Sequence, residues 1–410
     1  MSYFAELRTH WRPLAASTIG HGVGIGVMAY VVGTFAPHLL AEFGWTRSQF
    51  ALLGTATLLT LVFLPVVGRA ADLFGVRRTA LLGVIYMPMS FYALSTIGGD
   101  FRVFIAIVIS QVVLGIGTST TVYSRLVAER FVQARGLGLA IMASGPAIVG
   151  AIGSPLLSDY IDEHGWRAGY RLMAAFTACL GVLALALVPS GQQPAPAARR
   201  ARSAPRDYAA IARSRAFWLI AGGMFLCNIA APLHGPQLKL MLLDAGAPAL
   251  DAARLVSLYA IGVIVGRFAC GLALDRFAAH RIAALSMGLP AIGMFLIASP
   301  LDAWWTLWVA VSLMGLSQGA EGDIAGYLVV RHFGVGIFSS VLGLIIAALG
   351  VASSLGALLL SLSLSPTDSY APFLAASAVA VLIGSLLFLG LGRSGEFVDP
   401  AAETAPASAA

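Results

Sequence analysis

Charged side chains are scarce in this chain. Asp, Glu, Lys and Arg make up 11% of its 410 residues, whereas a soluble domain carries roughly 25%. Hydrophobic residues reach 59%, and the mean hydropathy is +0.86. So few charges cannot cover the surface of a soluble protein, and we expect lipid to surround most of the chain. The net charge of +6 comes from arginines in predicted loops, without a basic stripe that interleaves aromatics, so we expect no nucleic-acid partner.

Cysteine is equally rare. Only Cys179, Cys227 and Cys270 occur, each inside an apolar run, where they are typical of small core residues and not of a disulfide framework. The sequence has no CxxC or HExxH spacing and no visible set of nucleophile and base. We therefore expect no metal site, no cofactor and no enzymatic activity.

No cleavable leader is predicted. The first 13 residues are polar and carry Arg8 and Arg12. The apolar run after them is too long for the core of a signal peptide and lacks a clear cleavage site. We expect this run to remain in the protein as its first membrane span.

Long apolar runs are what the chain has in abundance. A spanning helix needs about 20 mostly apolar residues. Twelve such runs lie at about 14–40, 49–67, 79–98, 102–128, 136–158, 170–189, 216–240, 254–274, 282–299, 303–330, 338–363 and 371–391. The predicted fold is an all-α integral membrane protein with twelve transmembrane helices in two pseudo-symmetric six-helix bundles.

One connection between the runs is longer than the others. Residues 190–213 are rich in Pro, Ala and Arg and contain no apolar run. We therefore expect four parts in chain order. They are an N-terminal six-helix bundle (1–189), a cytoplasmic linker (190–213), a C-terminal six-helix bundle (214–393) and a disordered cytoplasmic tail (394–410).

A short pattern occurs twice, 203 residues apart, and each copy lies at the end of an apolar run. The first copy runs from Gly68 to Arg78 and the second from Gly271 to Arg281. Five positions coincide, namely Gly68 with Gly271, Ala70 with Ala273, Asp72 with Asp275, Phe74 with Phe277 and Arg78 with Arg281. The repeat indicates a duplicated bundle whose two loops occupy the same side of the membrane.

The basic residues predict which side that is. Most of the 25 Lys and Arg residues fall on one side if the N-terminus is cytoplasmic, and cytoplasmic loops carry the excess of positive charge in membrane proteins. Both copies of the repeated pattern then face the cytoplasm. We expect a multi-pass protein of the bacterial inner membrane with both termini in the cytoplasm.

Two six-span halves, a basic central linker and a Gly-xxx-Asp loop after spans two and eight resemble the major facilitator superfamily over about residues 10–393. The first loop matches the superfamily signature well, and the second has Ala278 where the signature has glycine. Finer matches lie at 43–47, within 129–140 and at 266–271. Together these are similar to the monocarboxylate and oxalate/formate porter branches.

The resemblance implies a transporter whose two bundles rock around a central site. The repeated loops would act as gates. Their glycines would allow close helix approach, their aspartates would meet helix N-termini or arginines across the cytoplasmic gap, and their arginines would meet lipid phosphate or acidic partners. These contacts would exist in the outward-open state and break on switching. The alternative is a loop that is basic only to set the topology. The predicted gating residues are Gly68, Asp72, Arg77, Arg78, Gly271, Asp275 and Arg276.

Arg267 is a charge inside predicted span eight, where a charge is costly and marks a function or a paired partner. It lies eight residues before Asp275, which is roughly 12 Å along a helix. In the branches that the chain resembles, an arginine at this place binds the substrate carboxylate. A guanidinium suits that task because it grips a carboxylate through two parallel hydrogen bonds. The alternative is a structural arginine paired with a neighbouring helix.

Glu321 and Asp323 lie in predicted span ten at about the depth of Arg267. Two residues apart on a helix means about 200° apart in direction, so both cannot face the same partner. A carboxyl group in a low-dielectric interior is a natural proton carrier, because burial favours its neutral form. We expect one of them to couple transport to protons. The alternative is a structural ion pair with Arg125 or Arg267.

Two histidines lie inside predicted spans. His21 stands among alternating glycines in span one, and His234 lies between Pro232 and Pro236 in span seven. Those prolines are expected to break the helix and expose backbone groups to a cavity. Either histidine could bind substrate or relay protons, or could simply pack. The other predicted substrate-binding residues are Tyr30, Tyr123, Gln237 and Tyr259.

Departures from both branches narrow the substrate. Oxalate/formate porters have a second basic residue in span eleven, but 339–365 contains no Lys or Arg. The animal monocarboxylate carriers have an acidic residue one turn before the span-eight arginine, where this chain has Val263. They also have a basic residue in span one, where only His21 stands. One fixed cation in the cavity favours a monoanion over a dianion.

The leading hypothesis is secondary active transport of a small organic anion, a monocarboxylate, by proton symport and alternating access. We expect a monomer whose partners are the anion, the proton and membrane lipid. Two alternatives stay open. One is proton-driven efflux of a drug or metabolite, which intramembrane carboxylates would also suit. The other is a non-transporting membrane sensor, for which the short linker and tail offer little.

Overall fold

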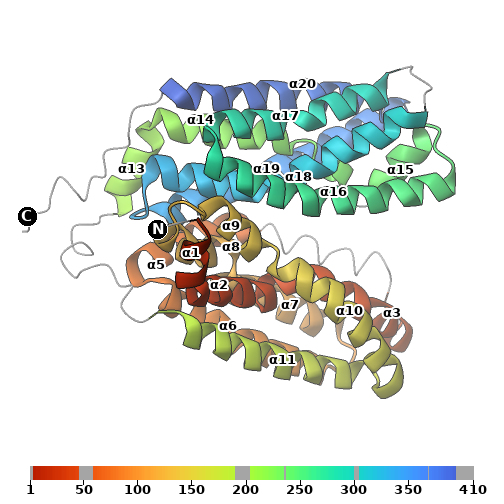
Figure 1. The fold of residues 1–410 in the computed structure, drawn as a ribbon. Coiled ribbons are helices and arrows are strands. Elements are labelled where there is room, and N and C mark those ends of the chain that lie inside the picture. Colours follow the sequence, from red (N-terminus) through yellow and green to blue (C-terminus); the bar gives the residue numbers. More distant parts are fainter. Residues whose placement is uncertain are drawn as a thin grey trace, which may run out of the picture.

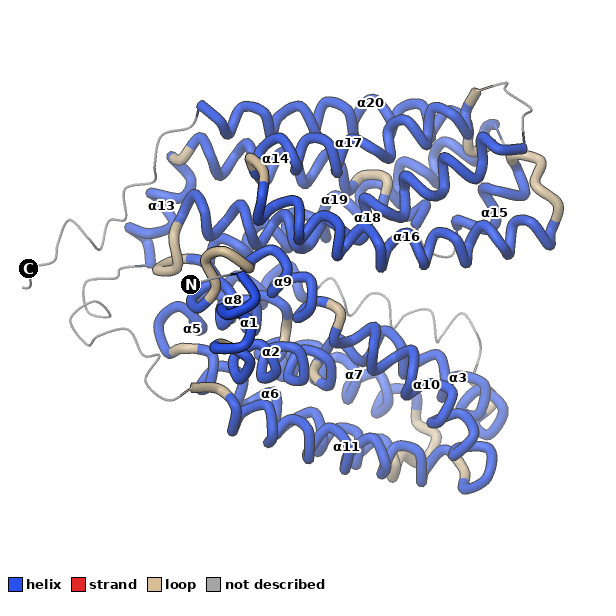
Figure 2. Tube along the Cα trace, in the orientation of Figure 1, coloured by secondary structure: helices blue, strands red, loops and turns tan. Residues whose placement is uncertain are grey.

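The computed structural model describes residues 3–45, 59–189, 204–234, 237–299, 304–367 and 369–393. Every regular element in these ranges is a helix (Figure 2). Seven helical segments of the described chain are long and apolar enough to cross a membrane, or eight if the bent pair at 206–228 counts as one span. Predicted spans one and seven, which are not among these seven, are each divided into shorter helices.

The N-terminal bundle contains predicted spans one to six. Its elements are α2 (Trp11–Val23), η1 (Ile25–Val27), α3 (Met28–Phe43), α5 (Leu59–Phe74), α6 (Val76–Leu94), α7 (Phe101–Gly115), η3 (Ile116–Thr118), α8 (Thr120–Arg130), α9 (Arg135–Ala143), α10 (Gly145–His164) and α11 (Trp166–Leu187). The first part of predicted span two lies outside the described residues.

The C-terminal bundle contains predicted spans seven to twelve. Its elements are α14 (Arg215–Asn228), η4 (Ala231–His234), α15 (Gln237–Asp244), α16 (Ala249–Arg276), α17 (Ala279–Ala298), α18 (Trp304–Phe333), α19 (Phe338–Thr367), α20 (Ala371–Leu387) and η5 (Phe388–Arg393). The two bundles lie one above the other in Figure 1, which agrees with the predicted two-bundle architecture.

Two short helices lie outside the spans. Helix α1 (Tyr3–Thr9) precedes span one, and α13 (Ala204–Arg213) precedes span seven. Helix α13 falls within the stretch that the sequence predicted as a linker, and it meets α14 at a bend of 72°. Its amphipathic sequence accounts for the helix, because one face can pack while the other stays polar.

Three spans of the N-terminal bundle break near the same level. Span one breaks at Gly24, where the amide of Ile25 donates to the Thr118 hydroxyl at 2.9 Å in the break of span four. Span five breaks between α9 and α10, where Gly145 packs against Gly22 of span one. In the C-terminal bundle only span seven breaks in the same way, between α14 and α15, among the elements that the structure describes. The proline-rich part of span seven is thus irregular, as predicted.

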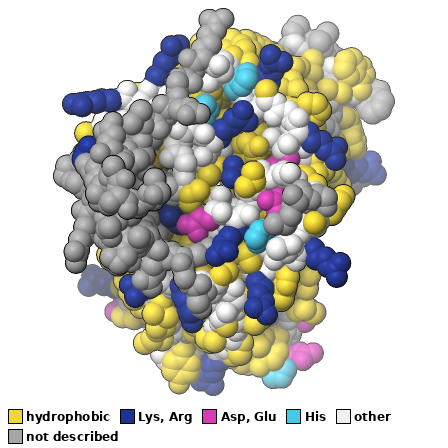
Figure 3. Space-filling view, turned by 60° about the vertical axis from the view of Figure 1, so that its left-hand side comes forward, with side chains coloured by type: hydrophobic (Ala, Val, Ile, Leu, Met, Phe, Trp, Pro, Cys, Tyr) yellow, Lys and Arg dark blue, Asp and Glu magenta, His cyan; other side chains and the backbone are white. Residues whose placement is uncertain are grey.

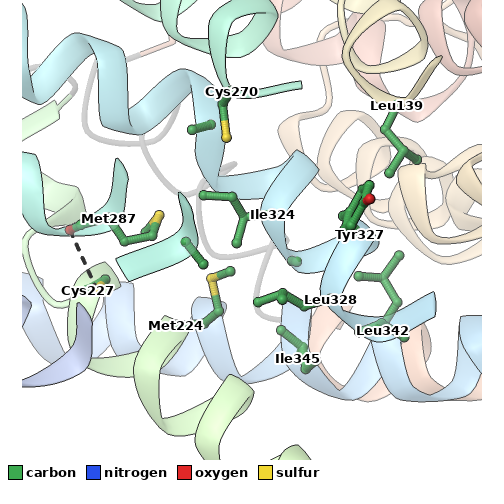
Figure 4. Packing of buried hydrophobic residues seen from close by; sticks show 14 of the residues in the cluster. Leu139, Met224, Cys227, Cys270, Met287, Ile324, Tyr327, Leu328, Leu342 and Ile345 are labelled. Carbon is green, nitrogen blue, oxygen red and sulfur yellow. Dashed lines mark hydrogen bonds between the residues drawn. The ribbon is translucent and has the colours of Figure 1, made fainter. Parts of the chain in front are cut away.

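The two bundles pack tightly at one end of the molecule. We call this the closed end, the end at which Asp72 of α5 and Asp275 of α16 contact the opposite bundle. One hydrophobic cluster runs through both bundles there, with Leu139 of α9 facing Tyr327 of α18 (Figure 4). A second cluster, around Phe91, lies within the N-terminal bundle alone. From the closed end the bundles diverge (Figures 1 and 2).

Candidate functional site

Asp72, from the first copy of the repeated pattern, joins the two bundles. It is fully buried, and its carboxylate accepts hydrogen bonds from the amides of Ser339 and Ser340 at 3.0 and 2.7 Å. The Ser340 hydroxyl adds a third at 2.6 Å. These serines lie in the first turn of α19, so Asp72 stabilises the positive end of a helix in the other bundle.

Arg125 of α8 completes this contact. Its guanidinium forms a buried ion pair with Asp72 and a second ion pair with Glu129 at 2.6 Å. The side chain of Arg125 is only 7% exposed. Arg125 thus pairs with Asp72 and Glu129. The alternative in which Arg125 forms an ion pair with Glu321 or Asp323 is therefore wrong.

Asp275, from the second copy, makes the corresponding contact in reverse. Its carboxylate accepts from the amides of Gly136 and Leu137 at 2.6 and 3.1 Å, in the first turn of α9. The hydroxyl of Tyr3 donates to the same carboxylate at 2.9 Å. Each aspartate of the repeat thus caps a helix of the opposite bundle.

The glycines of the repeat allow these contacts. A methyl group built on Gly68 would overlap the carbonyl oxygen of Ser339, and one built on Gly271 would lie 2.8 Å from the carbonyl oxygen of Gly136. No side chain fits at either crossing without a shift. Both glycines are therefore required for backbone contact between the bundles.

The predicted gating arginines lie elsewhere. Arg77, Arg78 and Arg276 are exposed, and Arg276 lies close enough to Tyr3 of α1 for an electrostatic interaction. The face at the closed end carries scattered arginines with acidic and hydrophobic side chains between them (Figure 3). The arginine that pairs is Arg69, which is buried and forms an ion pair with Asp207 of α13. This pair was not predicted from the sequence, although Arg69 directly follows Gly68 in the repeated pattern.

Arg267 lies where the two bundles meet in the interior. Arg267 belongs to α16, and its Nη1 donates a hydrogen bond of 2.9 Å to the carbonyl oxygen of Ala143. Ala143 is the last residue of α9 in the N-terminal bundle. Its Nε donates to Gly319 of α18 at 3.4 Å. A helix C-terminus carries partial negative charge, so the broken span five offers this cation a favourable partner.

Asp323 is the carboxylate next to Arg267. The Nε of Arg267 and Oδ2 of Asp323 are 4.0 Å apart, and that oxygen makes no hydrogen bond within the described residues. Asp323 is 2% exposed, whereas the Arg267 side chain is 22% exposed. The ion pair is therefore loose, and its cationic member is the more accessible one.

Close packing of α16 on α18 sets this geometry. A methyl group on Gly319 would overlap the carbonyl oxygen of Val263, and one on Gly266 would overlap that of Leu316. Small residues let helix backbones approach in a membrane. Arg267 therefore lies directly beside Gly319, where an added methyl group would stand 2.8 Å from the Arg267 amide nitrogen.

Glu321 belongs to a different group of polar side chains. It accepts hydrogen bonds from the amide nitrogens of Asn228 and of Gln318, the latter at 3.0 Å. Gln318 Oε1 lies 2.5 Å from Nδ1 of His234, whose ring stands 5.9 Å from that of Tyr259. The break of span seven supplies both Asn228 and His234. The structure thus gives Glu321 and Asp323 separate partners on the two sides of α18.

His21 lies on the N-terminal side of the same region. Its Nε2 is 2.9 Å from the Thr120 hydroxyl, and its Nδ1 is buried without a partner within the described residues. The neighbouring Gly22 packs against Gly145, two residues after Ala143, which binds Arg267. His21 and Arg267 therefore approach the break of span five from opposite bundles.

The remaining predicted residues are dispersed. Tyr123 is fully buried against Gly20. Gln237 accepts a hydrogen bond from the Tyr370 hydroxyl at 2.5 Å, away from Arg267. The side chain of Tyr30 lies outside the described residues. Asn228 and the Ala143 carbonyl also belong to the site, and neither was predicted from the sequence. The Ala143 carbonyl is available to Arg267 only because span five breaks at that residue. Over the described ranges, no cluster of three His, Cys, Asp or Glu residues could hold a metal ion.

Sequence comparisons agree with this architecture. The model of the Major Facilitator Superfamily matches residues 19–240. Monocarboxylate transporter 11 of Homo sapiens is 24% identical over 398 residues, covering 94% of this chain and 83% of that protein. Monocarboxylate transporter 3 of Rattus norvegicus is 27% identical over 359 residues, covering 84% and 72% respectively.

Solved structures show the same fold. The E. coli fucose:proton symporter FucP has a TM-score of 0.73 at 14% identity, covering 96% of this chain and all of that chain. A bacterial homologue of the iron transporter ferroportin in an outward-facing state also has a TM-score of 0.73 at 14% identity, covering 94% and 99%. At these identities the likeness concerns the fold alone.

Proposed function

Because this chain belongs to the major facilitator superfamily, we propose that it transports a small organic monocarboxylate, coupled to protons, by alternating access. The chain is a multi-pass membrane transporter and not an enzyme. The names of the two monocarboxylate transporters among its relatives support the proposed substrate class.

One observation carries the proposal, namely the position of Arg267. It is a partly exposed cation in the membrane interior, it donates to Ala143 of the opposite bundle, and the Asp323 carboxylate stands 4.0 Å away. A guanidinium has five N–H donors, and two of them make the hydrogen bonds to Ala143 and Gly319. The others can accept an incoming carboxylate through two parallel bonds.

Asp323 is our first choice for the proton-coupling residue. In its charged form it competes with a substrate carboxylate for Arg267. Protonation removes that competition, so a proton and an anion would bind together and cross with no net charge. Because Asp323 is nearly inaccessible, the substrate would meet the guanidinium and not the carboxyl group.

Glu321 is the second proton-coupling candidate. Its hydrogen bonds to Gln318 and Asn228 lead on to His234, which lies at the break of span seven. The amide of Gln318 neither accepts nor releases a proton near neutral pH, so it links Glu321 to His234 by hydrogen bonds without relaying a proton. We assign Glu321 a supporting role that sets the rate of exchange rather than the coupling itself.

The aspartates of the repeat form the gate in this proposal. The excess of arginine in the loops at the closed end supports a cytoplasmic location for it. The contacts of Asp72 with α19 and of Asp275 with α9 then hold the cytoplasmic side shut and break when the bundles rock. The structure would thus represent the outward-open state of a protein of the inner membrane.

Uptake into proteoliposomes tests the proposal. We expect Arg267→Ala to lower the rate of uptake of short radiolabelled monocarboxylates at least about a hundredfold, because a buried hydrogen bond to a charged group is worth about 3 kcal/mol. Arg267→Lys keeps the charge but loses the planar fork, and should retain only a small part of the activity. Uptake by Arg267→Ala equal to that of the parent would refute the substrate site.

An imposed pH gradient tests the coupling separately. Inward proton flow should accelerate uptake by the parent, and flux that ignores the gradient would remove the coupling. A strain that overproduces the protein provides a third comparison. Broad tolerance to toxic compounds, without monocarboxylate uptake, would favour proton-driven efflux instead.

A further inference from the structure

Helix α1 lies across the closed end, next to the turn between α8 and α9 (Figure 1). It is only seven residues long and is not a membrane span. Yet Tyr3 and Leu7 pack against the hydrophobic cluster that both bundles share, and the ring of His10 meets that of Phe131 edge-on at 5.6 Å. The helix is therefore fixed to the body of the protein at the point where the bundles meet.

Glu6 makes the central contact of α1. Its carboxylate accepts three backbone hydrogen bonds, from Val132 at 2.7 Å, Gln133 at 3.0 Å and Ala134 at 2.8 Å. These amides directly precede the first turn of α9. The side chain of Glu6 is 6% exposed, so the three bonds are sheltered from water. A carboxylate in this place stabilises the start of α9 as an N-cap residue would.

Tyr3 connects the same helix to the other bundle. Its hydroxyl donates to Oδ2 of Asp275 at 2.9 Å, and that oxygen also accepts from the amide of Leu137. Burial raises the pKa of the Tyr3 hydroxyl, and the hydrogen bond to Asp275 acts in the same direction. The hydroxyl thus remains a donor across the physiological range of pH.

The carboxylates of Glu6 and Asp275 accept hydrogen bonds from different amides at the N-terminus of α9. Glu6 holds the amides of 132–134, and Asp275 holds those of Gly136 and Leu137. Five consecutive or nearly consecutive amides are thereby fixed by one side chain of α1 and one of α16. If α1 departed, the turn before α9 would lose three hydrogen bonds to Glu6, and Asp275 would lose the hydrogen bond from Tyr3.

We propose that α1 is a brace for the closed end, in which Glu6 and Tyr3 are positioning residues that hold the first turn of α9 against Asp275. The brace acts on one gate contact only. On the other side, at Asp72, α13 takes the corresponding place through the ion pair of Asp207 with Arg69. The segment before each bundle therefore supports one of the two aspartate contacts.

A cysteine reporter tests the brace without any substrate, so the result is independent of the proposed carboxylate transport. Leu139→Cys places a thiol on α9 at the buried contact with α18, where Leu139 is 2% exposed. The exposed Cys179 is first replaced by serine. The rate of reaction with a small thiol reagent, measured in lipid nanodiscs, then reports how often the closed end opens.

We expect Glu6→Gln to raise this rate roughly tenfold, since a charged acceptor of several hydrogen bonds is lost. Tyr3→Phe removes only the hydroxyl and should raise the rate roughly threefold. Phe4→Ala is the matched control on the same helix, because the side chain of Phe4 is 77% exposed, and it should leave the rate unchanged.

Unchanged labelling in both Glu6→Gln and Tyr3→Phe would overturn the brace. Thermal unfolding of each variant shows whether it is folded. If Glu6→Gln fails to fold, Tyr3→Phe decides, because it keeps the ring and its packing. Faster labelling of Phe4→Ala to the same extent would also refute the proposal, since the effect would then belong to α1 as a whole and not to these two contacts.

Discussion

The two bundles share a frame but differ in how they carry polarity into the membrane. The N-terminal bundle breaks spans one, four and five near one level and places uncharged groups there, such as His21, Thr118 and the Ala143 carbonyl. The C-terminal bundle keeps spans eight and ten as single helices, α16 and α18, and places Arg267, Glu321 and Asp323 on them. Around Arg267, the N-terminal bundle thus offers backbone and polar side-chain groups, and the C-terminal bundle offers the carboxylates and the guanidinium.

The difference has a physical basis. A formal charge in lipid needs a rigid position and a partner, and a continuous helix supplies the rigidity. A broken helix exposes carbonyl and amide groups that need partners of their own, and Arg267 provides one of these. The repeated aspartates, Asp72 and Asp275, are a feature that both bundles share. The candidate site instead uses Arg267, Glu321 and Asp323, which are present in the C-terminal bundle alone.

The largest effect should come from the two aspartates of the repeat. We expect Asp72→Asn to lower the free energy of unfolding by about 3 kcal/mol, because Arg125 keeps its buried charge but loses a charged partner. Asp275→Asn should cost only about 1 kcal/mol, since its partners are two amides and a hydroxyl and it is less buried. Denaturation of both purified variants in detergent measures the difference. Equal losses would mean that the two halves of the gate are energetically equivalent.

The glycines of the repeat should come next. Gly68→Ala forces a methyl group onto the Ser339 carbonyl and should cost about 2 kcal/mol, as overpacked positions do. Gly271→Ala has slightly more room and should cost about 1 kcal/mol. Gly322→Ala is the control in α18, because nothing lies within 4 Å of its added methyl group, and it should be neutral or stabilising. A loss at Gly322 as large as at Gly68 would show that close approach is not the cause.

The two carboxyl groups of α18 should separate coupling from rate. We expect Asp323→Asn to reduce the stimulation of uptake by a proton gradient about tenfold, which is the effect of about 1.4 kcal/mol. Glu321→Gln should keep the stimulation and slow turnover about threefold, because its hydrogen bonds to Asn228 and Gln318 are partly retained. Counterflow and pH-driven uptake measured side by side distinguish the two. The reverse result would transfer the coupling role to Glu321.

The smallest effect should come from the neutral polar contact between Thr120 and His21 in the N-terminal bundle. Thr120→Val removes the hydrogen-bond partner of His21 and should lower stability by about 0.5 kcal/mol, the low end for a neutral hydrogen bond. The exposed Ser354, whose hydroxyl binds only its own helix, provides the control, and Ser354→Ala should change stability by less. A loss at Thr120 that matched that of Asp72→Asn would contradict the smaller contribution expected from a neutral contact than from a buried ion pair.

The spans were predictable from the sequence because the thickness of a bilayer fixes the length of apolar sequence that crosses it. The irregular part of span seven at Pro232 was also predictable, whereas Pro236 lies outside the described residues. Helix α1 and helix α13 were not predicted, since both are too short and polar to give a span signal. Their fixed positions depend on contacts with distant residues, such as that of Asp207 with Arg69, 138 positions away.

The candidate site was predictable only in part. The rarity of charge inside apolar runs pointed to Arg267, Glu321 and Asp323, and their spacing along a helix implied different directions. Their partners were not predictable, because the Ala143 carbonyl becomes available only where span five breaks. The roles of the arginines in the repeated pattern were not predictable either. Arg77, Arg78 and Arg276 are exposed, whereas Arg69 is buried against α13 and forms an ion pair with Asp207.

The sequence by itself therefore determined that the chain crosses a membrane, that it is duplicated, and which few residues carry charge into the interior. These are properties of local composition and spacing. Only the tertiary structure decided that Asp72 caps α19, that Asp275 caps α9, and that Glu6 holds the turn before α9. Such pairings join residues more than 100 positions apart, and they depend on where helices cross and which backbone groups those crossings leave to be satisfied.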